Sequence, residues 1–148
     1  MVMNIRVILP IFVVVGGFVL AALQAQAPTR TVWDGVYTEE QAEKGRAVYE
    51  ERCAACHGRA LEGVEMAPAL RGSQFLSNWN GQTVGDLFER TRTTMPQDDP
   101  GGLSRAVNAD IMAFVLQANS FPAGKFALPR QDIVLNQIRI EAKKSGQE

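Results

Sequence analysis

The 148-residue chain has few of the residues on which disulfide-rich, metal-rich and nucleic-acid-binding proteins depend. Two cysteines are too few for a disulfide-stapled domain, and a single histidine excludes histidine-rich metal sites. Fifteen Lys and Arg against sixteen Asp and Glu give a formal charge of −1, which excludes nucleic-acid binding through bulk positive charge. A hydrophobic content of 46% excludes wholesale disorder, and the length predicts one folded domain.

Residues 1–25 have the pattern of an export signal. A cation at Arg6 precedes an apolar run over residues 7–23, and small and polar residues follow it. This order is typical of a signal peptide, so we predict cleavage after Ala25 and a periplasmic or other extracytoplasmic location for the rest. The apolar run is slightly shorter than the ~20 residues that span a bilayer. An uncleaved anchor is therefore the alternative, and only that form would contact the membrane.

The remaining sequence divides into three predicted parts. Residues 26–37 are expected to form a linker, residues 38–120 the folded domain, and residues 121–148 a C-terminal extension. Glycine, proline and polar residues recur over residues 58–82, which argues against regular structure there. In the extension, apolar residues alternate and predict a short extended segment: Ile133, Leu135, Ile138 and Ile140.

Helix caps and apolar spacing predict three helices. Thr38 and Gln41 match a capping box at the start of a helix from about 39 to 53. Thr83 is the expected N-cap of a second helix, and Ser104 that of a third. Apart from the short extended segment near the C-terminus, the chain is predicted to be all-α.

The two cysteines and the histidine lie together in a C-x-x-C-H motif, the attachment signature of a c-type heme. Thiols at Cys53 and Cys56, near the end of a helix, can reach the two vinyl groups on one heme edge. His57 then places an imidazole under the iron. A zinc site would need a second ligand pair, which the chain lacks, and a thioredoxin-like redox pair would follow a strand. We therefore predict one covalent heme c.

Around this motif the chain resembles the monoheme cytochrome c family, whose members are small His/Met electron carriers. Gly45 and Tyr49 precede Cys53 as in that family's N-terminal helix, and residues 110–115 resemble the partner helix that Gly45 would touch. Residues 67–72 resemble its Pro-x-Leu-x-Gly loop. The resemblance implies a small cytochrome c fold, with three or more helices around the heme and an irregular C-terminal wrap. It also implies that the Pro68 carbonyl accepts a hydrogen bond from His57 Nδ1.

Three further segments resemble exported bacterial cytochromes that are paired with quinoprotein dehydrogenases. They are residues 33–38, residues 93–96 and residues 121–124. This narrower resemblance implies redox protein partners, such as a quinoprotein dehydrogenase and a terminal oxidase.

The second axial iron ligand is expected to be Met95. It lies in a loop between two predicted helices and is followed by a proline, and the family places its methionine ligand in such a loop. Met112 lies within a helix beside core positions and is expected to be packing. There are two alternatives. One is Met66, which lies just before the proline expected on the histidine side of the heme, and the other is an open coordination position.

These ligands predict a one-electron carrier rather than an enzyme, because iron held by both His57 and Met95 has no vacant position for a substrate. Two alternatives are a cytochrome subunit of a dehydrogenase complex and a heme enzyme or sensor with a labile sixth ligand. Four side chains could bind the heme propionates: Arg59, Arg71, Trp79 and Arg92. The other interpretation is core packing for Trp79 and solvent-exposed surface charge for the three arginines.

Overall fold

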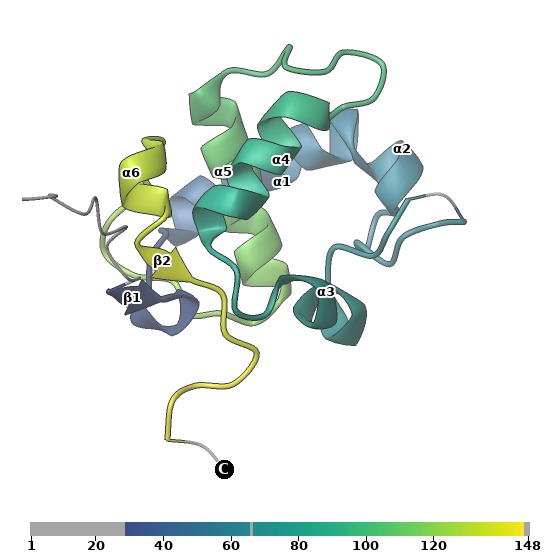
Figure 1. Ribbon diagram of the computed structural model, residues 1–148. Coiled ribbons are helices and arrows are strands. Elements are labelled where there is room, and N and C mark those ends of the chain that lie inside the picture. Colours follow the sequence, from purple (N-terminus) through teal and green to yellow (C-terminus); the bar gives the residue numbers. More distant parts are fainter. Residues whose placement is uncertain (1–28, 66, 147–148) are drawn as a thin grey trace, which may run out of the picture.

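A computed structural model describes residues 29–65 and 67–146 (Figure 1). The predicted signal peptide and Met66 lie outside these described residues. The fold is mostly helical, with two very short strands. In chain order the elements are β1 (Arg30–Thr31), the 3-10 turn η1 (Val32–Asp34), α1 (Glu39–Arg52), α2 (Ala54–His57), α3 (Gly72–Trp79), α4 (Val84–Thr94), α5 (Arg105–Ala118), α6 (Asp132–Leu135) and β2 (Ile138–Arg139). Among the described residues, no helix has the length and apolar character needed to cross a membrane.

The two longest helices, α1 and α5, form the centre of the fold and pack against each other more extensively than any other pair. Gly45 is the residue that permits this contact, because a β-carbon there would collide with the backbone carbonyl of Asp110. Ile111 and Phe114 of α5 are buried, as the resemblance to cytochromes c implied. The predicted pairing of the N-terminal and C-terminal helices is therefore confirmed.

The caps of the second and third predicted helices are confirmed. The Asp86 N–H donates to Thr83 Oγ1 at 3.0 Å, and the Thr83 N–H donates to the Asp86 carboxylate at 2.9 Å, which completes a capping box at α4. The Val107 N–H donates to Ser104 Oγ at 3.3 Å at the start of α5. Local hydrogen bonds thus decide where both helices begin.

The expectation of irregular structure over residues 58–82 is wrong for its last part, which contains α3. Phe75 of this helix is fully buried, and Trp79, one turn later on the same side, is partly buried. Burial of this short apolar face against the rest of the core stabilises the helix, and glycine and proline counts give no measure of such burial.

The N-terminal segment predicted to be a linker is packed into the domain over its described residues, 29–37. Val32, Val36 and Tyr37 are buried, and the Tyr37 hydroxyl donates to the Phe121 carbonyl at 2.6 Å. β1 also pairs in parallel with β2, which joins this segment to the C-terminal end of the chain. The prediction failed because these apolar residues find their partners far away in the sequence.

The C-terminal extension wraps around the domain, as predicted, but its secondary structure differs from the expectation. Leu135, Ile138 and Ile140 are buried. Residues 132–135 form the helix α6, in which Ile133 is 77% exposed. Of the four apolar residues expected to alternate along a strand, only Ile138 lies in one, β2. A helical turn and a strand that follow each other closely can imitate one alternating strand in the sequence.

The extension is also held by Gln41, which behaves differently from the prediction. The Gln41 N–H donates to Thr38 Oγ1 at 3.2 Å, so half of the expected capping box forms. The Gln41 side chain turns away and pairs with the backbone of Leu128, donating to its carbonyl at 3.1 Å and accepting its N–H at 2.6 Å. A buried amide that satisfies two distant backbone groups replaces the local contact.

Candidate heme site

The C-x-x-C-H motif occupies the junction between α1 and α2. Cys53 follows the last residue of α1, and its carbonyl accepts hydrogen bonds from the N–H groups of Cys56 at 3.2 Å and His57 at 2.9 Å. The two cysteines and the histidine thus belong to one helical turn. Both thiols are free; that of Cys53 is partly buried and that of Cys56 is exposed.

The imidazole of His57 is held in one orientation. Its side chain is 8% exposed, and Nδ1 lies 2.9 Å from the Pro68 carbonyl oxygen. Because a carbonyl can only accept, Nδ1 carries the proton and Nε2 keeps its lone pair for a metal. The contact implied by the resemblance is therefore present, and it is the arrangement that fixes a histidine ligand in many metal sites.

Backbone hydrogen bonds close the loop that carries Pro68. The Gly63 N–H donates to the His57 carbonyl at 2.8 Å, and the Leu70 N–H donates to the Leu61 carbonyl at 2.9 Å. The Tyr49 hydroxyl, fully buried below the motif, donates to the Gly58 carbonyl at 2.7 Å. Burial, and to a smaller extent the neighbouring Cys53 and Glu62, raises the pKa of Tyr49, so the phenol stays a donor at neutral pH.

Met95 directly follows α4, and its N–H donates to the Thr91 carbonyl at 2.9 Å. Its side chain is partly buried. The loop that follows it is tied to the heme motif, because the Arg52 guanidinium, next to Cys53, lies 3.6 Å from the Asp99 carboxylate. Met112 is 2% exposed inside α5, which confirms its interpretation as core packing.

The alternatives to heme do not fit this site. Burial, reinforced by Cys56 and partly offset by Arg52, raises the pKa of the Cys53 thiol to about 11. A reactive redox thiol needs a lowered pKa instead. Within residues 29–65 and 67–146, no cluster of three or more His, Cys, Asp and Glu side chains could hold a metal ion by itself. Two free thiols in the same turn as an imidazole with an available Nε2 fit a heme site better than zinc binding or disulfide exchange.

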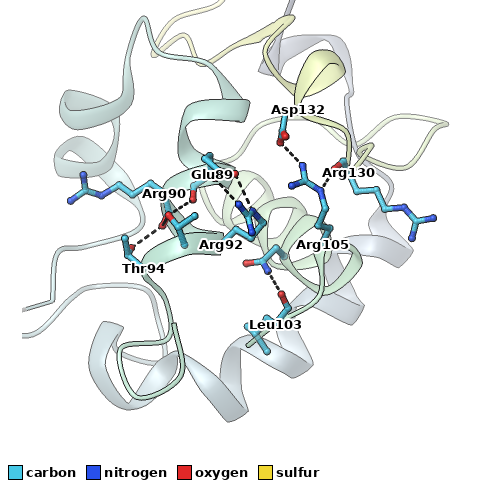
Figure 2. A network of polar contacts seen from close by, with 10 residues as sticks. Glu89, Arg90, Arg92, Thr94, Leu103, Arg105, Arg130 and Asp132 are labelled. Atoms are coloured by element: carbon cyan, nitrogen blue, oxygen red, sulfur yellow. Dashed lines mark hydrogen bonds and ion pairs between the residues drawn. The ribbon is translucent and has the colours of Figure 1, made fainter. Parts of the chain in front are cut away.

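The four side chains considered for the propionates differ in their environments. Arg92 is engaged by Glu89, with hydrogen bonds of 3.0 and 2.7 Å that Figure 2 shows. Arg59 and Arg71 are exposed, and Trp79 is partly buried against the core. Arg92 therefore has an identified role in pairing with Glu89 along α4.

Another ion pair, which the sequence did not suggest, holds the C-terminal extension. The Arg105 guanidinium pairs with Asp132 and donates to the Arg130 carbonyl at 2.8 Å, as Figure 2 shows. It also stacks over the Phe88 ring, 4.9 Å from its centroid. This residue joins α4, α5 and the extension.

Comparison with known families agrees with the geometry of the site. The model of the family described as "Cytochrome C oxidase, cbb3-type, subunit III" matches residues 40–115, which are 76 of the 148 residues. The chain belongs to this cytochrome c family. Membership implies a heme c cofactor and electron transfer by the heme. No curated protein matches this cytochrome.

One solved structure similar to this cytochrome is the "Crystal Structure of the Sulfane Dehydrogenase SoxCD from Paracoccus pantotrophus". The sequence identity is 23% and the TM-score is 0.45, over 64% of this chain and 55% of that chain. The cytochrome thus corresponds to little more than half of the SoxCD chain.

Proposed function

We propose that this cytochrome is an exported electron carrier whose heme is attached through Cys53 and Cys56 and whose iron is held by His57 and Met95. His57 directly follows the second cysteine of the motif. The observation that supports the proposal most directly is the hydrogen bond from its Nδ1 to the Pro68 carbonyl. Because Nδ1 carries the proton, Nε2 is the only imidazole nitrogen whose lone pair can bind the iron.

Each residue has a distinct task. Cys53 and Cys56 retain the cofactor by thioether bonds, His57 supplies a basic, oriented nitrogen, and the thioether of Met95 favours the ferrous state and raises the reduction potential. The bound heme supplies reversible one-electron chemistry at iron. With both His57 and Met95 bound to the iron, oxygen or peroxide would have no place to bind.

Export and partners are part of the same proposal. Attachment of a c-type heme takes place outside the cytoplasm, which agrees with the predicted signal peptide at residues 1–25. We propose redox proteins as partners, among them a quinoprotein dehydrogenase and a terminal oxidase. The sequence has only four lysines, so docking through a ring of lysines is disfavoured: Lys44, Lys125, Lys143 and Lys144.

A cytochrome subunit docked in a dehydrogenase complex is the second candidate function. It is favoured by two large apolar side chains that the packed C-terminal extension leaves in contact with solvent. Phe126 is 80% exposed and Ile133 is 77% exposed. Co-purification of the native protein with a dehydrogenase through high-salt washing would support this function over a freely diffusing carrier.

Heme attachment is tested by mass spectrometry of the mature protein. We expect one heme adduct that survives acid–acetone extraction, one thioether after replacement of either Cys53 or Cys56, and mostly unfolded apoprotein after replacement of both. Extractable heme in the wild type would overturn covalent attachment.

Axial ligation is tested with carbon monoxide, which binds ferrous heme only where a position is open. The reduced wild type should refuse it and the ferric form should show the weak far-red band of methionine ligation. Met95→Ala should bind carbon monoxide and become high-spin in the ferric state, whereas Met112→Leu, a core control, should do neither. A wild type that binds carbon monoxide readily would favour the enzyme or sensor function instead.

A further inference from the structure

The residue that ends α5, Asn119, connects this helix to the loop carrying Pro68. Its amide nitrogen donates to the Leu70 carbonyl at 2.9 Å, and its side-chain oxygen accepts the Gly72 N–H at 2.9 Å. The amide therefore satisfies one acceptor and one donor of the same short loop segment. That segment lies 47 to 49 residues earlier in the chain.

The side chain of Asn119 is itself fixed. Its amide nitrogen also donates to the Val115 carbonyl at 2.9 Å, one turn back in α5, and the residue is partly buried. A helix-end asparagine needs only such a local bond to satisfy its own helix. The two bonds to Leu70 and Gly72 go beyond that and make α5 a rigid support for the loop.

The same loop segment is restrained from its other side. Leu70, two residues after Pro68, donates its N–H to the Leu61 carbonyl at 2.9 Å while its own carbonyl is held by Asn119. The Pro68 carbonyl, two residues before Leu70, accepts from His57 Nδ1 at 2.9 Å. Its position thus depends on the backbone on both sides: Ala67, which exchanges two backbone hydrogen bonds with Val64, precedes it, and the segment anchored by Asn119 at Leu70 and Gly72 follows it.

We propose that Asn119 is a positioning residue for the proximal histidine: it holds the Pro68 carbonyl against His57 and so adjusts how basic the imidazole is toward the iron. The proposal rests on the function proposed above, in which His57 is an iron ligand. A firm Nδ1–H bond makes the imidazole a stronger donor, which favours ferric iron. Loosening the loop should weaken the bond and raise the midpoint potential.

The test compares Asn119→Ala with Gln41→Ala in the heme-loaded protein. Gln41 is a matched control, because its amide also bridges a distant backbone carbonyl and N–H, but those of Leu128 in the C-terminal extension. Both variants should lower the unfolding temperature. Only Asn119→Ala should raise the midpoint potential. Only this variant should also speed solvent exchange of the His57 Nδ1 proton, which is measured by proton NMR of the reduced protein.

Two further results make the outcome decisive. If Asn119→Ala does not fold, Asn119→Ser, which keeps a polar group but is too short to bridge Leu70 and Gly72, should show the same two changes. A folded Asn119 variant with unchanged potential and exchange rate, or a Gln41 variant that shifts both equally, would overturn the positioning role. The wild type is measured first: absence of a histidine-ligated heme there would refute the proposed function rather than the role of Asn119.

Discussion

Replacing Tyr49 by phenylalanine removes one hydroxyl from beneath the heme motif and leaves the ring in place. The ring is fully buried and packs against Phe114 with centroids 5.2 Å apart, so packing should survive. What is lost is the 2.7 Å hydrogen bond to the Gly58 carbonyl, one residue after His57. A buried carbonyl left without its donor costs roughly 1–3 kcal/mol.

That free energy has a measurable size. For a domain near 100 residues, 1 kcal/mol lowers the unfolding temperature by about 4 °C or slightly more, so Tyr49→Phe should lower it by about 4–12 °C. Differential scanning calorimetry of the heme-loaded protein measures this. Because Gly58 adjoins His57, we also expect incomplete heme attachment or a shifted visible spectrum.

Tyr37→Phe is the control for this prediction. The Tyr37 hydroxyl is equally buried and donates to the Phe121 carbonyl at 2.6 Å, at the junction with the C-terminal extension. Its loss should lower stability by a similar amount without changing the heme spectrum. If Tyr49→Phe proved as stable as the wild type, or if both variants altered the spectrum alike, the specific role of Tyr49 beneath the motif would be refuted.

Two other predictions follow from the helix contact and from the pKa values. Gly45→Ala should destabilise the protein by about 3 kcal/mol in chemical denaturation, because the new methyl group meets the backbone of Asp110, whereas exposed Glu50→Ala should change it by less than about 0.5 kcal/mol. Burial, with a smaller contribution from Glu39, raises the pKa of Tyr37 from 10.0 to about 12. The unfolded chain then ionises first, so unfolding free energy should fall between about pH 10 and pH 12, and Tyr37→Phe should reduce that fall; an equal fall in both proteins would contradict the assignment.

The heme motif and the starts of the main helices could be predicted from the sequence, because they depend on residues that are close together in the chain. The C-x-x-C-H motif needs only five consecutive residues, and the caps at Thr83 and Ser104 act within one turn. The family resemblance also predicted the contact at Gly45 and the bond from His57 to Pro68. Whether Met95 is the second ligand stays a prediction.

The tertiary structure alone decided how the flanking segments pack onto the domain. Gln41 could have completed its local capping box but pairs instead with Leu128, and Asn119 reaches back to Leu70 and Gly72. The described part of the predicted linker, residues 29–37, became part of the core for the same reason. Buried polar groups and irregular apolar residues take whichever partners the assembled fold places beside them, and no local spacing in the sequence encodes those partners.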